Sequence, residues 1–213
     1  MTDEERHLRR KLNDEIALAI AMMAVYTFDL SAGTITSHAW AIGIHGILAN
    51  QHAAAVAIGR HAANPDSPVS TTETDKIVGQ MIADNETLWL SGFRDAVAEG
   101  AYTEADSQAL KADAIAKRLR MYALKIEASA NEAFVEASPA GSTFRWNLDD
   151  DTDHCQGNHL MNCPAIAKKG PYTRYTIPTY PRAGATPCLT HCKCWLTRLE
   201  DGAQPFEPAA EEN

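Results

Sequence analysis

Apolar residues recur at three- and four-residue spacing through the first 140 residues, which is the periodicity of amphipathic α-helices. Thr72 precedes Asp75 by three residues, a pattern that resembles a capping box and so predicts a helix start. We predict four helices: residues 4–29, residues 36–62, a third from Thr72 to near Gly100, and a fourth from Thr103 to Ser138-Pro139. These segments predict a mainly α fold whose first part, residues 1–140, is a helical body.

Each predicted helix has an apolar stripe that we expect to face the core. The stripes are Leu8, Leu12, Ile16, Ile20 and Met23; Trp40, Ile44, Ile47, Ala54 and Ile58; Ile77, Met81, Ile82, Leu88 and Trp89; and Ile115, Leu119, Tyr122, Ile126 and Phe134. Glycines at 43, 46 and 59 would let a neighbouring helix approach the second helix closely.

The run from Ile16 to Phe28 is apolar and free of charge, and it is broader than one stripe. Its 13 residues are fewer than the roughly 20 that a bilayer span needs, so we expect no membrane insertion. The run instead indicates a helix buried between protein chains, as in a homo-oligomer. The acidic start of the chain, with Asp3, Glu4 and Glu5, also predicts no secretory signal.

The pattern changes after Gly141. Residues 143–148 alternate like a short strand, and five prolines between Pro164 and Pro187 exclude long helices. We therefore predict a small irregular β module at residues 141–200, called the cysteine module below. Residues 201–213 read as an exposed, disordered acidic tail.

Charge separates these three parts of the 213-residue chain, whose net charge is −9. The helical body has 12 basic and 19 acidic residues, a net of −7, and the tail has four acids and no base. The cysteine module has 7 basic and 5 acidic residues, a net of +2. Because phosphate binding needs clustered Lys and Arg, this distribution argues against a general nucleic-acid binder.

All five cysteines lie in the module, spaced Cys155-x7-Cys163, then 24 residues, then Cys188-x3-Cys192-x-Cys194. Close cysteines on two turns joined by a loop are typical of a structural tetrahedral zinc site. On spacing alone, Cys155, Cys163 and Cys188 are the first candidates, and Cys192 or Cys194 completes the set. His154, His159 and His191 are substitute ligands; disulfides or free thiols are the alternatives to zinc.

Other candidate chemistry is weaker. His38, His45 and His52 recur every seven residues, so adjacent rings lie about 10 Å apart along a helix, too far to share a metal. Asp149, Asp150, Asp151 and Asp153 lack the glycine and glutamate of a calcium loop and indicate a solvated turn. No deaminase, nucleophile-elbow or phosphate-loop motif is present, so we expect no enzymatic activity.

The segment from Arg118 to Leu196 carries a series of short motifs in a fixed order. They are Tyr122-Ala123, Ala130-Asn131-Glu132-Ala133-Phe134, Arg145-Trp146, Asp153-His154-Cys155, Cys163, Gly170-Pro171-Tyr172-Thr173, Ile177-Pro178, Gly184 and Cys188-Leu-Thr-His-Cys-Lys-Cys194. In order and approximate spacing this series resembles the C-terminal part of tailed-phage head morphogenesis proteins, the minor capsid proteins of the Mu F-like group. Here the first cysteine pair is wider, and Cys188 stands where many relatives have a histidine.

The resemblance implies a structural virion protein of the phage head, made in the bacterial host cytoplasm. Its implied partners are other phage structural proteins: portal, major capsid or neck chains. A zinc-stabilised interaction or regulatory adaptor outside the virion is the alternative that the residues leave open, and an enzyme with an open catalytic zinc is a third.

Overall fold

The structure is a computed structural model that describes residues 2–100, 108–149, 162–186 and 189–207, and it confirms the predicted mainly α fold with a small two-stranded sheet. The elements of the helical body are α1 (Asp3–Ser31), α2 (Ser37–Ala63), α3 (Glu73–Trp89), α4 (Ser91–Ala98), α5 (Gln108–Ala123) and α6 (Lys125–Ala137). Those of the cysteine module are β1 (Phe144–Asn147), α7 (Cys163–Lys169), a 3₁₀ turn at Leu189–His191 and β2 (Trp195–Arg198).

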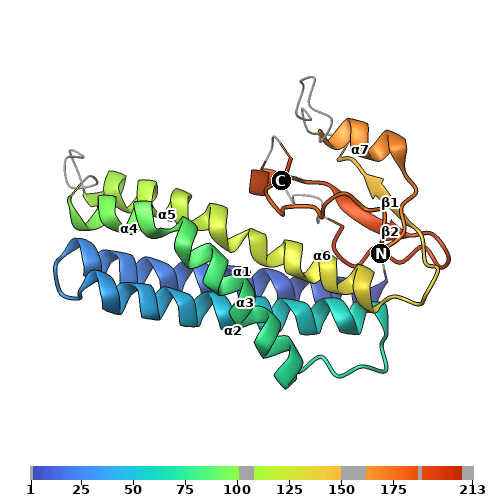
Figure 1. The fold of residues 1–213 in the computed structure, drawn as a ribbon, viewed down its shortest axis with the longest axis horizontal. Coiled ribbons are helices and arrows are strands. Elements are labelled where there is room, and N and C mark those ends of the chain that lie inside the picture. The colour runs from blue at the N-terminus through green and yellow to red at the C-terminus, as the bar shows by residue number, and fades with distance from the viewer. Residues whose placement is uncertain (1, 101–107, 150–161, 187–188, 208–213) are drawn as a thin grey trace.

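Helix α2 is the centre of the bundle, and α1, α3 and α6 all pack against it (Figure 1). Its side chains Trp40, Ile44, Leu48 and Ile58 are completely buried. The indole nitrogen of Trp40 donates to the Thr27 hydroxyl at 3.1 Å, so its one polar atom is satisfied inside the core. The first two helices thus use the stripes that periodicity predicts.

Threonine caps mark where three of the helices begin. Thr2 and Thr72 form capping boxes with Glu5 and Asp75, and the Thr36 side chain accepts from the Ala39 amide. These caps satisfy amide groups that have no partner within the helix. The predicted capping box at Thr72 is confirmed.

By length and composition, α2 is the one helix in the described part of the chain that is apolar enough to cross a membrane. In its most apolar window, 56% of the helix is buried inside the bundle, as expected of a central core helix. The absence of membrane insertion stays a prediction.

Two of the four predicted helices are each broken into two. The third turns at Leu90, so that α4 leaves α3 and the Phe93 ring reaches Trp40 at a centroid distance of 6.4 Å. The fourth breaks at Leu124, between α5 and α6. Both leucines keep right-handed helical angles, and no glycine or proline stands at either break. Burial of Leu90 and Leu124 accompanies these breaks, so tertiary packing overrides the local pattern.

The predicted core stripe of the third helix is wrong. Helix α3 buries Asp75, Gly79, Ala83 and Glu86, and exposes large apolar side chains of the predicted stripe. A Cβ on Gly79 would collide with the backbone of α2 at Ala49, so the two helices touch through this glycine. The close approach requires small residues on the inner face and leaves the bulky ones outside.

The glycines of α2 behave differently from one another. A Cβ on Gly59 would overlap the Ala130 carbonyl of α6, and one on Gly43 would overlap the Tyr26 ring of α1. The predicted close approach is confirmed at both positions. It is wrong at Gly46, where a Cβ would meet nothing within 4 Å.

The cysteine module is built on an antiparallel pair of strands, β1 and β2, in which Phe144 faces Arg198 and Trp146 faces Leu196. Tyr172 extends this pair through two backbone hydrogen bonds to Phe144, of 2.7 and 2.8 Å. Phe144, Trp146 and Leu196 belong to the same hydrophobic cluster as the helical core. The apolar core is therefore continuous across residue 140.

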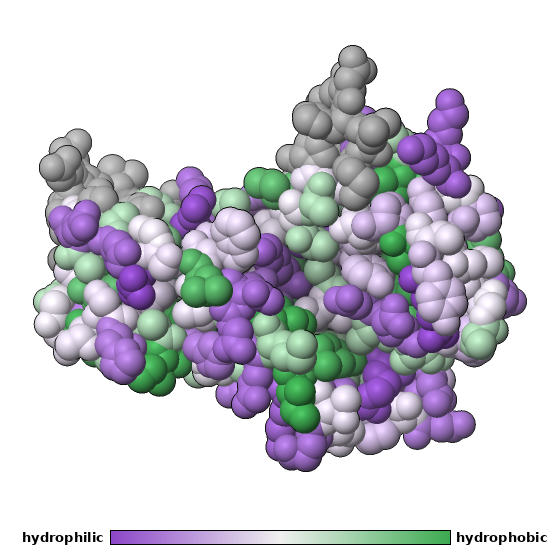
Figure 2. All heavy atoms as spheres, in the orientation of Figure 1, coloured by the Kyte–Doolittle hydropathy of each residue, from purple (hydrophilic) through white to green (hydrophobic). Residues whose placement is uncertain are grey.

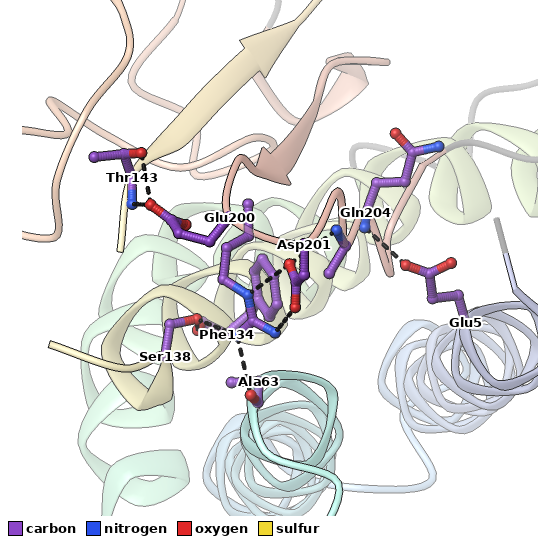
Figure 3. Close-up of polar contacts among 10 residues, drawn as sticks. Glu5, Ala63, Phe134, Ser138, Thr143, Glu200, Asp201 and Gln204 are labelled. Carbon is purple, nitrogen blue, oxygen red and sulfur yellow. Dashed lines mark hydrogen bonds and ion pairs between the residues drawn. The ribbon is translucent and has the colours of Figure 1, made fainter. Parts of the chain in front are cut away.

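Arginines of the module hold it against the ends of the helices. Arg198 donates to the Ala63 carbonyl at 3.0 Å and to the Ser138 hydroxyl at 3.1 Å, and Figure 3 labels both of these partners. It also pairs with Asp201 at 2.6 Å. Arg174 donates to the Glu136 carbonyl at 2.8 Å and also to the Ser138 carbonyl, near the C-terminus of α6.

A buried carboxylate, Glu127 of α6, makes a second junction. Its Oε2 lies 3.0 Å from Arg9 of α1 and 3.1 Å from Arg182 of the module, and its side chain is 1% exposed. Two guanidinium groups from distant parts of the chain thus share one carboxylate. Loss of both guanidinium groups would strongly destabilise the fold, because it would leave an uncompensated buried charge.

The predicted exposed tail is wrong for residues 203–207, which are partly or fully buried; Asp201 and Gly202 are exposed, and residues 208–213 lie outside the described residues. Phe206 is 1% exposed, and its ring meets Phe134 edge-on at 6.3 Å. The backbone amide of Gln204 donates to the Glu5 carboxylate of α1 at 2.8 Å, a contact drawn in Figure 3. One aromatic residue among acidic ones is enough to anchor this segment in the core.

Substitution of the two glycines of α2 separates close packing from helix propensity. Gly59→Ala should lower the free energy of unfolding by about 1–3 kcal/mol, because the new methyl group overpacks the α2–α6 contact. Gly46→Ala is the matched control and should raise it by up to about 1 kcal/mol, because alanine is the better helix former. Urea unfolding followed by circular dichroism measures both, and equal shifts in one direction would contradict the α2–α6 contact.

Removing the Phe206 side chain tests whether the final segment belongs to the core. Phe206→Ala should lower the free energy of unfolding by about 3 kcal/mol, the usual cost of emptying a buried aromatic site. Tyr175→Ala should change it by less than about 0.5 kcal/mol, because Tyr175 is 89% exposed. Equal denaturant midpoints for the two variants would show that residues 201–207 do not pack on the helices.

Candidate metal centre

Three cysteines meet in the interior of the module: one begins α7, and the other two lie on the Cys-x-Cys stretch that leads into β2. Cys163, Cys192 and Cys194 are 0%, 1% and 1% exposed, and their sulfur atoms all lie within 4.8 Å of one another. The Sγ atoms of Cys163 and Cys192 are 3.7 Å apart, and all three thiols are free of disulfides. Among the described residues they form a ready set of three soft ligands.

Local structure explains how the chain brings these thiols together. Cys163 is the first residue of α7, whose start is fixed by the Asn162 side chain accepting from the Ala165 amide at 2.7 Å. Cys192 follows the 3₁₀ turn, and burial alternates from there into β2, with Cys192, Cys194 and Leu196 facing inward. Because alternate residues of an extended chain face the same side, the Cys-x-Cys pair supplies two inward thiols.

The donor set fits a tetrahedral metal ion. Zinc lies about 2.3 Å from each thiolate sulfur, so ligand sulfurs in a tetrahedral site are roughly 3.8 Å apart. The 3.7 Å separation of Cys163 and Cys192 matches that edge. The three thiols can therefore hold a metal ion, and a fourth ligand would complete a structural site.

Without a bound cation, the surroundings of the cluster oppose the loss of a proton from the Cys194 thiol. Hydrogen bonding from Cys163 lowers the pKa of the Cys194 thiol, but Cys192 and burial outweigh it and raise that pKa well above its ordinary value. Thiolates this close repel one another in a buried setting. A bound divalent cation would reverse this preference, because a coordinating thiol loses its proton to the metal.

Of the predicted ligands, the structure brings together Cys163, Cys192 and Cys194. The other candidates, Cys155, Cys188, His154 and His159, lie outside the described residues. His191 is exposed and is not part of the cluster. The spacing left open whether Cys192 or Cys194 completes the site. In the structure both of these thiols belong to the cluster.

Sequence reasoning missed the residues that join this centre to the helical body. Trp146, paired with Leu196 across the sheet, is 1% exposed and belongs to the same hydrophobic cluster as Cys194. Arg198 follows Cys194 by four residues on the same inward face and reaches the ends of α2 and α6. The inward alternation from Cys192 to Arg198 was the available signal, because an arginine at an inward position requires buried partners.

Comparisons of the chain with protein-family models, with curated proteins and with solved structures give no match. The function of this centre is therefore argued from its geometry and from the order of its motifs.

Proposed function

We propose that this chain is a structural component of a tailed-phage head, a minor capsid or head morphogenesis protein, with a zinc ion that locks its cysteine module. The observation that carries the proposal is the buried cluster of Cys163, Cys192 and Cys194. It lies within the segment from Tyr122 to Cys194, whose motif order resembles that family.

Zinc would act here as a folding element. In its described residues the module has two four-residue strands, one seven-residue helix and one 3₁₀ turn, which is little regular structure to stabilise it. Thiolate bonds from the first residue of α7, from the residue after the 3₁₀ turn and from the residue before β2 would tie these pieces to one point. Metal-binding energy then becomes folding energy.

The same geometry supports a role without catalysis. A catalytic zinc keeps one position open for water, whereas a fourth cysteine beside the three buried ones would close the shell. A groove of about 480 Å³ lies between the start of α1 and residues 201–205, but its charged residues serve as structural ion pairs. Glu4 pairs with His61 at 3.2 Å, and Asp201 pairs with Arg198 at 2.6 Å.

The proposed partners are portal, major capsid or neck chains, met through the helical body. The net charge of −7 on residues 1–140 fits protein contacts better than contacts with packaged nucleic acid. The proposed location is the virion, after synthesis in the bacterial host cytoplasm. An adaptor outside the virion would use the same zinc lock and differs only in where the protein is found.

Metal analysis tests the zinc lock. Purified protein should contain one zinc per chain, and Cys163→Ser and Cys192→Ser should lose it, together with part of the near-ultraviolet signal of Trp146. Tyr175→Ser, an exposed site in the same module, should keep both. Cys155→Ser and Cys188→Ser, made separately, should identify the fourth ligand, since the ligand variant alone loses the metal. Full stability of Cys163→Ser without metal would contradict the lock.

Particle composition tests the virion role separately. The protein should be found by mass spectrometry in purified phage particles at low copy number, and Cys194→Ala should be absent from them. Tyr175→Ala serves as the control that is incorporated normally. Wild-type protein that binds zinc but is found only outside particles would overturn the virion role and favour the adaptor, leaving the zinc lock intact.

A further inference from the structure

Helix α1 has a second apolar stripe on the side away from its core. Its inner stripe includes Leu12, Ile16, Ala19 and Met23, which are buried. Its outer stripe consists of Leu18, Met22, Val25 and Phe28, which are 48%, 40%, 60% and 39% exposed. The spacing of four, three and three residues places these four on one helix face, and no charged residue lies between Ile16 and Phe28.

Helix α3 has a similar stripe on its outer side. Ile77, Met81, Leu88 and Trp89 are 57%, 63%, 73% and 74% exposed. The first three recur at four and seven residues, on the face opposite Gly79. Figure 2 shows hydrophobic side chains gathered on the molecular surface where α3 crosses the bundle.

Charged side chains on α3 have partners within the chain. Lys76 pairs with Glu73 at 2.6 Å, and Asp84 pairs with His45 of α2 at 2.8 Å. Single exposed apolar residues are common on soluble proteins, but stripes that follow one helix face for three turns mark contact surfaces. The described residues therefore carry one such face on α1 and another on α3.

We propose that these two faces bind each other between copies of this chain: the α1 face of one copy docks on the α3 face of the next. The stripes match in length, because ten residues separate Leu18 from Phe28 and eleven separate Ile77 from Leu88, about 15–17 Å of helix. Both helices pack on α2 rather than on each other, so one copy can engage two neighbours. A head-to-tail contact of this kind builds a ring if it closes and a filament if it does not.

Charge favours this arrangement over self-pairing of the α3 face. In a two-fold α3–α3 contact the axis passes near the middle of the stripe, where it would bring Asp84 of each copy together. The α1 face offers no charge at the corresponding place. Two acidic molecules, each of net charge −9, can thus meet without burying like charges against each other.

The exposed apolar side chains would form the centre of such a contact. At their stated exposures the eight side chains present on the order of 800 Å² of accessible surface, about half of what a standard interface of about 1,600 Å² buries in total. Polar rim residues of the two helices supply the rest. Trp89 is the expected anchor, because tryptophan dominates interface energetics when it becomes buried.

Mixing two variants tests the contact directly. By light scattering after size exclusion at about 100 µM, wild-type protein should be larger than a dimer, or should grow with concentration. Val25→Glu, which blocks the α1 face, and Leu88→Glu, which blocks the α3 face, should each be monomeric. Their equimolar mixture should form a one-to-one dimer, because one intact face of each kind remains. Tyr175→Glu, an exposed aromatic site outside both faces, should assemble like wild type.

Three outcomes would overturn the proposal. A monomeric wild type would show that these faces serve a different protein partner. A dimer of Val25→Glu alongside a monomeric Leu88→Glu would show self-pairing of α3. A mixture that stays monomeric would exclude contact between the two faces. Circular dichroism checks folding, and Val25→Gln with Leu88→Gln replaces any glutamate variant that loses helical signal.

Discussion

The buried guanidinium of Arg198 is the interaction on which the arrangement of this protein depends. Its nitrogens reach the Ala63 carbonyl of α2, the Ser138 hydroxyl at the end of α6 and the Asp201 carboxylate. Its Cζ atom lies 5.4 Å from the centre of the Phe134 ring. A buried guanidinium is tolerated only when its donors are satisfied. The ends of two helices and the last strand must therefore meet at one point.

The metal centre and the arginines act on the same short stretch of chain. Cys192, Cys194 and Arg198 lie on the inward side of residues 192–198, the cysteines toward α7 and the arginine toward the helical body. A metal ion would fix one end of this stretch, and ion pairs fix the other. The module is then held in position relative to the helical body, because the stretch that contains β2 is fixed at both ends.

Periodicity was sufficient to predict the parts of the fold that depend on local sequence. The Thr72 cap, the inner stripes of α1 and α2, and β1 follow from spacing and residue type. Long-range contacts decided the rest. The break at Leu124 carries no glycine or proline, and Phe206 stands alone in an acidic segment, so neither had a local signal. For the metal centre, spacing identified the cysteines, but only folding shows that both thiols of the Cys-x-Cys pair face inward.

The error at α3 is informative because it has a physical cause. A helix chosen only for apolar burial would turn Ile77 and Leu88 toward α2. Instead, Gly79 fits against the backbone of α2, Asp75 pairs with Arg60 at 2.8 Å, and Glu86 pairs with His52 at 3.2 Å.

These contacts outweigh the burial of the larger side chains, since the close approach, the Asp75–Arg60 ion pair and the Glu86–His52 hydrogen bond are lost if α3 rotates by half a turn. Rotation would leave two carboxylates without their buried partners and place bulky residues where the helix backbones touch. Packing within the described residues therefore fixes α3 with its apolar side outward, and this is the side that the proposed contact between copies would bury.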